Sequence, residues 1–133
     1  MAAPPQVSAA DPFELPDWLG TGPVTWTAQT SVRGAHRITG DLTGSGPDDG
    51  ERLPCDLMAA DVAYPQPLLD DGWRRQAHQA WEHGQVLLVT CEGRLTLPVP
   101  GTAYSADGTL ETIGRLAKAL GVPAARFTVC LRL

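Results

Sequence analysis

The fold of this chain is decided around the stretch Val86-Leu87-Leu88-Val89-Thr90-Cys91-Glu92-Gly93-Arg94-Leu95-Thr96-Leu97. Two apolar runs flank the Glu92-Gly93 dipeptide, and this pattern predicts a β-hairpin. We expect its strands to cover residues 85–91 and 94–99. Two prolines, Pro98 and Pro100, predict that the second strand ends early or lies at a sheet edge, because proline cannot donate to a ladder.

Periodicity in the rest of the chain predicts four further strands and two helices. Alternation of apolar and polar residues favours strands over residues 24–30, 35–43, 52–58 and 127–133. Helical spacing predicts one helix from Asp70 or Asp71 to about His83, and a second from Ser105 or Asp107 to about Leu120. The order β-β-β-α-β-β-α-β predicts one α+β domain over residues 11–133. Its sheet is expected to be mostly antiparallel, with about six strands and both helices packed over it.

The bulk composition argues against several classes of protein. The chain has 133 residues, and 43% hydrophobic against 19% charged residues is typical of one globular domain. It contains no apolar run long enough for a membrane span, and residues 1–6 lack the features of a signal peptide, so we expect a cytoplasmic protein. A net charge of −5 argues against nucleic acid as a partner. Abundant Ala and Gly with Arg in place of Lys indicate a GC-rich bacterial genome.

The N-terminal region combines a low-complexity tail with an aromatic segment. Residues 1–10 are rich in Ala and Pro, which predicts a disordered tail. Residues 11–23, here named the leader, are framed by prolines and carry four large apolar side chains, Phe13, Leu15, Trp18 and Leu19. Such side chains are costly to leave in water. The leader is therefore either a strap over the chain's own core or an anchor that docks on another protein.

Metal binding has one weak set of candidate ligands, on the first predicted helix. His78 and Glu82 lie four residues apart on one face, but His83 points in another direction. An exposed His–Glu pair on a solvated helix is the commoner explanation, so no metal and no cofactor is predicted. The three cysteines, Cys55, Cys91 and Cys130, form no C-x-x-C pair and are expected to be reduced, buried thiols.

No catalytic motif is visible, so the sequence favours a function without catalysis. There is no G-x-S-x-G elbow, and the adjacent acidic pairs do not suggest facing acid and base carboxylates. The aromatic leader and an antiparallel sheet with a usable edge favour a non-catalytic protein-interaction domain or adaptor. The expected partner is another protein or a second copy in a homodimer. The alternative is a small-ligand-binding protein or small enzyme with a pocket between the sheet and a helix.

Overall fold

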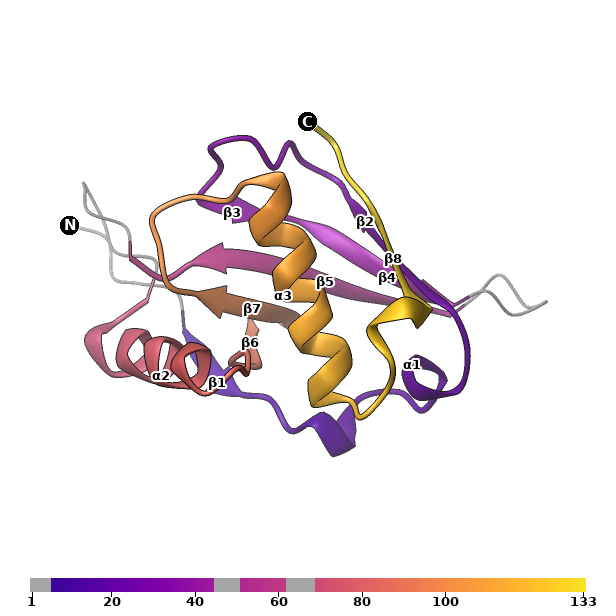
Figure 1. Ribbon diagram of the computed structural model, residues 1–133. Helices are drawn as coiled ribbons and strands as arrows, with labels where there is room; N and C mark the ends of the chain where they lie inside the picture. Colours follow the sequence, from indigo (N-terminus) through magenta and orange to yellow (C-terminus); the bar gives the residue numbers. More distant parts are fainter. Residues whose placement is uncertain (1–5, 45–50, 62–68) are drawn as a thin grey trace.

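A computed structural model describes residues 6–44, 51–61 and 69–133 (Figure 1). Within these residues the chain forms an α+β fold with a mixed sheet of eight strands and three helices. The strands are β1 (Val7–Ala9), β2 (Val24–Ala28), β3 (Arg37–Ile38), β4 (Gly40–Gly44), β5 (Arg52–Ala59), β6 (Val89–Cys91), β7 (Arg94–Val99) and β8 (Phe127–Cys130). The helices are α1 (Trp18–Thr21), α2 (Asp71–Glu82) and α3 (Ala106–Ala119), with short 3-10 turns η1 (Pro12–Glu14) and η2 (Ala124–Arg126).

The strand order is β1-β6-β7-β5-β4-β2-β8, and β3 pairs with β5 beyond the end of β4. Two pairs, β5–β7 and β2–β8, are parallel, and the other pairs are antiparallel. The prediction of an α+β fold is confirmed, but the sheet is larger than six strands and mixed. Both parallel pairs join strands that are far apart in the sequence: α2 and β6 lie between β5 and β7, and most of the chain lies between β2 and β8. Parallel pairing requires such long connections, and a pattern read strand by strand does not indicate it.

The predicted hairpin forms, with β6 and β7 joined by Glu92 and Gly93, but β6 begins at Val89 and not at residue 85 as predicted. Both turn residues have left-handed backbones, with φ of 56° and 76°, as a type I′ turn requires. The prediction that the second strand lies at a sheet edge is wrong, because β7 lies between β6 and β5. Pro98 pairs with Met58 of β5 and is tolerated there because β6 stops pairing at Thr96, so within the described residues no strand residue is paired with Pro98 on the β6 side.

Both long helices begin and end close to the predicted positions. The Asp70 side chain caps α2 by accepting from the Trp73 N–H at 2.9 Å, and Ser105 caps α3 by accepting from the Gly108 N–H at 3.1 Å. After each helix, Gly84 and Gly121 adopt φ of 75°. Figure 1 shows that α3 crosses one face of the sheet and that α2 lies beside it.

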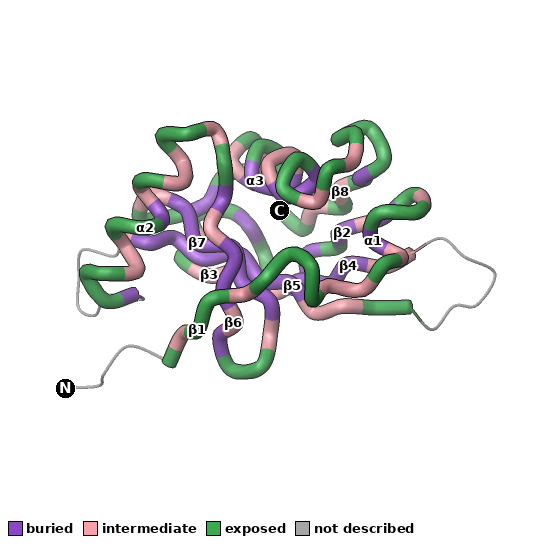
Figure 2. The backbone as a smooth tube through the Cα atoms, turned by 90° about the horizontal axis from the view of Figure 1, so that it is seen from below, coloured by how far each residue is buried: buried purple, intermediate pink, exposed green. Residues whose placement is uncertain are grey.

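Two apolar clusters hold these layers together, on opposite faces of β5. The main cluster packs α3 residues such as Leu116 onto Trp26, Leu42 and Leu57. A smaller cluster joins Met58 to Leu69, Cys91 and Ala77 of α2. Neighbouring residues of a strand point to opposite faces, so Leu57 and Met58 separate the two clusters. Figure 2 shows that the central strands are buried along most of their length.

The chain before β2 is more ordered than its composition suggested. Residues 1–10 were predicted to be a disordered tail, whereas residues 7–9 form β1 and pair with β6; residues 1–5 lie outside the described part. Leader residues 18–21 form the single turn of α1. None of the helices in the described residues has both the length and the apolarity needed to cross a membrane.

Candidate functional site

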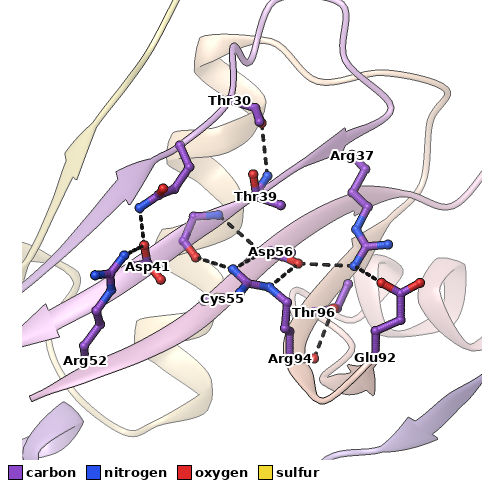
Figure 3. A network of polar contacts seen from close by, with 12 residues as sticks. Thr30, Arg37, Thr39, Asp41, Arg52, Cys55, Asp56, Glu92, Arg94 and Thr96 are labelled. Carbon is purple, nitrogen blue, oxygen red and sulfur yellow. Dashed lines mark hydrogen bonds and ion pairs between the residues drawn. The ribbon is translucent and has the colours of Figure 1, made fainter.

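A charged network lies on the face of β5 opposite α3, and Asp56 is its centre (Figure 3). The Asp56 side chain is fully buried. Arg94 binds both of its oxygens, through Nε and Nη2, each at 2.9 Å. Arg37 Nη2 and the Gly40 N–H each donate to it at 3.3 Å. A buried carboxylate is expensive unless it is paired and hydrogen-bonded, and this one has four such contacts.

At Gly40 and Cys55, side chains of the network take the place of backbone hydrogen bonds between β4 and β5. Continuing the register from Asp41↔Pro54 places Gly40 opposite Cys55. The backbone groups of these two residues bond side chains: the Gly40 N–H donates to Asp56, the Gly40 carbonyl accepts from Arg94 at 3.2 Å, and the Cys55 carbonyl accepts from the Trp26 indole N–H at 3.0 Å. Glycine is needed at position 40, because a Cβ there would lie 2.5 Å from the Trp26 ring.

A second buried carboxylate, Asp41, follows Gly40 on β4. It accepts hydrogen bonds from the side chains of Gln29 and Arg52. The hydrogen bond and charge of Asp41 raise the pKa of Arg52, and the hydrogen bond to Asp56 raises the pKa of Arg94. Both shifts favour the charged form of the guanidinium group.

These side chains line a pocket of about 570 Å³ formed by Gln29, Arg37, Thr39, Asp41, Arg52, Asp56, Glu92 and Arg94. We name it the arginine pocket. Its three arginines balance its three carboxylates, but the charges are layered. Asp56 and Asp41 have side-chain exposures of 0% and 7%, whereas those of Arg37, Arg94 and Arg52 are 26%, 32% and 59%. A molecule that approaches from solvent therefore meets guanidinium groups before the two buried carboxylates.

The leader residues predicted as interaction anchors divide into two groups. Leu19 is buried in the main cluster, and Leu15 and Trp18 pack partly against it, so these three strap the chain's own core. Phe13 is 95% exposed. It sits on η1, which Asp11 caps by accepting from the Phe13 N–H at 2.9 Å. We name residues 11–14 the leader turn.

A second hollow lies beside the leader turn, between α2 and α3. This groove of about 530 Å³ has an apolar lining that includes Pro12, Trp73, Val86 and Leu88, with Arg115 and Lys118 on the α3 side. Arg115 is fixed over the Trp81 ring at 3.5 Å and donates to the Trp81 carbonyl at 2.8 Å. The alternative interpretation of the sequence predicted a pocket between the sheet and a helix. This groove, which lies between two helices, is the hollow that comes nearest to it.

The weak metal candidates are not brought together. His78 Nε2 lies 2.6 Å from Asp61 Oδ2, and His83 Nδ1 lies 2.8 Å from the Gln79 carbonyl, while Glu82 is exposed. The described residues contain no group of three His, Cys, Asp or Glu side chains that could hold a metal ion. Two cysteines, Cys55 and Cys91, are buried, and Cys130 is exposed. Burial raises the pKa of the Cys55 thiol, so it is neutral and a poor nucleophile.

Sequence reasoning missed the arginine pocket as a site, although one signal was present. Asp56 interrupts the apolar run of β5, and a charged residue inside a buried strand demands a partner. The partner could not be named from the sequence, because Arg94 is 38 residues away. Comparisons of this chain with models of protein families, with curated proteins and with solved structures found no match.

Proposed function

We propose that this chain is a non-catalytic, cytoplasmic protein-interaction domain that self-associates. In this proposal the leader turn of one copy docks in the α2–α3 groove of a second copy, and the second copy does the same in return. The observation that carries the proposal is Phe13, a large apolar side chain that is 95% exposed on a braced turn.

The leader turn is held in place from both sides. Upstream, the Ala10 N–H donates to the Leu88 carbonyl at 3.0 Å, next to β1. Downstream, Leu19 is buried in the main cluster. Leaving a Phe side chain in water forgoes about 2 kcal/mol of burial. Because the turn is already ordered, docking Phe13 on a partner costs little further conformational entropy.

Charge and position favour a second copy as the occupant of the groove. The leader turn carries Asp11 and Glu14, whereas the groove presents Lys118 and, beside it, Arg115, which already pairs with Glu111 at 3.1 Å. Lys118 makes no ion pair within the described residues, so it is free to meet an acidic segment. Pro12 itself lines the groove, so turn and groove form one continuous patch. An isologous dimer needs such a self-complementary patch.

Light-scattering mass on a sizing column over a range of concentrations tests the proposal. The full chain is expected to dimerise, and Phe13→Ser to be monomeric, because each of two equivalent contacts loses about 2 kcal/mol. Leu133→Ser is the matched control, since Leu133 is 77% exposed but lies outside the groove. The charge reversal Lys118→Glu should weaken the dimer, and adding Glu14→Lys should restore it.

Two results would contradict the proposal. One is a full chain that stays monomeric at every concentration. The other is a dimer that survives both Phe13→Ser and Lys118→Glu, which would place the interface elsewhere on the molecule.

A further inference from the structure

We infer that the arginine pocket binds a small oxyanion, a phosphate or carboxylate group, through Arg37, Arg52 and Arg94. This inference concerns the face of the sheet opposite α3 and does not depend on self-association. It follows from three features of the pocket. Several N–H groups of the arginines make no hydrogen bond within the described residues, Arg37 Nε is buried without an oxygen or nitrogen acceptor, and the carboxylate of Glu92 already lies against Arg37 at the rim.

The three guanidinium groups keep unused hydrogen-bond donors. Arg94 engages the protein through Nε and Nη2, and both Arg37 and Arg52 do so through Nη2. Within the described residues, Nη1 of each makes no hydrogen bond. The buried carboxylates thus hold one edge of Arg94 and one nitrogen each of Arg37 and Arg52, and within the described residues other N–H groups are left for a ligand. Guanidinium groups bind phosphate and carboxylate oxygens in paired contacts, so an oxyanion is the ligand class that these donors fit.

One nitrogen of Arg37 is buried without an oxygen or nitrogen acceptor, and the Arg37 guanidinium lies within hydrogen-bond reach of the Cys91 thiol. In the described part of the chain, Arg37 Nε is the single buried side-chain nitrogen or oxygen that lacks a hydrogen bond. Folded proteins satisfy nearly all such groups, and a water molecule or a bound ion is one of the ways in which an exception is satisfied. An acceptor that enters on the edge of Arg37 formed by Nε and Nη2 would satisfy this donor, and Nη1, on the other side of the group, offers a separate contact.

Glu92 supplies the third argument, because it is an anion already placed at the rim. Its Oε2 lies 3.6 Å from Arg37 Nη2, and its side chain is 63% exposed. The type I′ turn directs it there, with a left-handed backbone that a non-glycine residue rarely adopts. An exposed carboxylate at that position competes with an incoming oxyanion for the same guanidinium group. Ligand binding should therefore displace Glu92, and its removal should strengthen binding.

Isothermal titration of the full chain with inorganic phosphate, and separately with succinate, tests this inference at constant ionic strength. Saturable binding of at least one probe is expected. Arg52→Gln, the most exposed of the three arginines, should weaken binding about tenfold, and Arg37→Gln by at least as much, since each removes charge-assisted hydrogen bonds. Glu92→Gln should strengthen binding several-fold. Arg75→Gln, a matched loss of charge on exposed α2, should leave the affinity unchanged.

Each result of the titrations either supports the inference or overturns it. Binding of phosphate alone or of succinate alone assigns the oxyanion class, and binding of both supports the shared chemistry. No saturable heat with either probe overturns the inference, and so does an affinity that Arg75→Gln lowers as much as Arg52→Gln does. Thermal melts of each variant show that loss of binding is not loss of fold. Because these substitutions lie outside the leader turn and the groove, the sizing profile should not change, so this inference and the proposed dimer fail independently.

Discussion

The two faces of β5 are both buried, yet they exclude water by different means. On one face Cys55 and Leu57 pack under α3 among apolar side chains. On the other face Asp56 is equally buried, but arginines and the backbone of Gly40 cover it. Apolar packing is non-directional, and its loss scales with the atoms removed. The ionic face depends on complete pairing, so the loss of a single partner exposes the full cost of a buried charge.

The largest expected effect is on the ionic face. Arg94→Met should lower the free energy of unfolding by about 4 kcal/mol, because the buried Asp56 carboxylate loses its bidentate partner. Urea denaturation measures this change. The double variant Asp56→Leu with Arg94→Met should recover most of the loss, since the buried carboxylate is removed together with its bidentate partner and Arg37 keeps its contact with Glu92. If the double variant is no more stable than Arg94→Met, the difference between the two faces is not one of charge pairing.

The corresponding change on the apolar face should be somewhat smaller. Leu57→Ala removes a fully buried side chain from the main cluster and should cost about 3 kcal/mol in the same denaturation experiment. No second substitution on the ionic face should rescue it, because the cavity remains. A cost below about 1 kcal/mol would show that the α3 layer closes over the gap and that this face is less tightly packed than its burial indicates.

A third prediction concerns the point where both faces meet, at Gly40. Gly40→Ala should destabilise the fold by about 2 kcal/mol, because the new Cβ forces the Trp26 ring away from its hydrogen bond to the Cys55 carbonyl. Gly114→Ala is the matched control. Nothing lies within 4 Å of a Cβ at position 114 on α3, and alanine is the better helix former there. The control should therefore be neutral or slightly stabilising.

The smallest expected effect is a pH dependence of stability that comes from Cys55, on the apolar face. Burial raises the pKa of Cys55 above its ordinary value of 9.0, so the thiol stays protonated when folded and ionises when unfolded above that pH. A raised folded pKa gives stability that is complete below pH 9 and declines as pH rises, by about 1.4 kcal/mol at pH 10. Denaturation at pH 8 and pH 10 should show a smaller decline for Cys55→Ala. An identical decline in both proteins would mean that other groups cause it.

Local patterns predicted the elements well and their partners poorly. The caps at Asp70 and Ser105 and the turn at Glu92-Gly93 depend on contacts within a few residues, so the printed sequence contains nearly all the information they need. Parallel pairing of β8 with β2 depends on contacts across about a hundred positions, with nothing local to indicate it. The leader shows the same limit, since its composition could not say which aromatic faces inward.

By itself, then, the sequence determined the class of fold, the positions of both long helices and the central hairpin, because hydrophobic period, capping and turn chemistry act over a few residues. Only the tertiary structure decided the strand order, the separation of Phe13 from its buried neighbours, and the meeting of Asp56 with Arg94. The physical reason is that a buried charge requires a partner but does not specify where along the chain that partner lies. Long-range packing brought Arg94 across 38 residues to Asp56, and the same packing formed the arginine pocket.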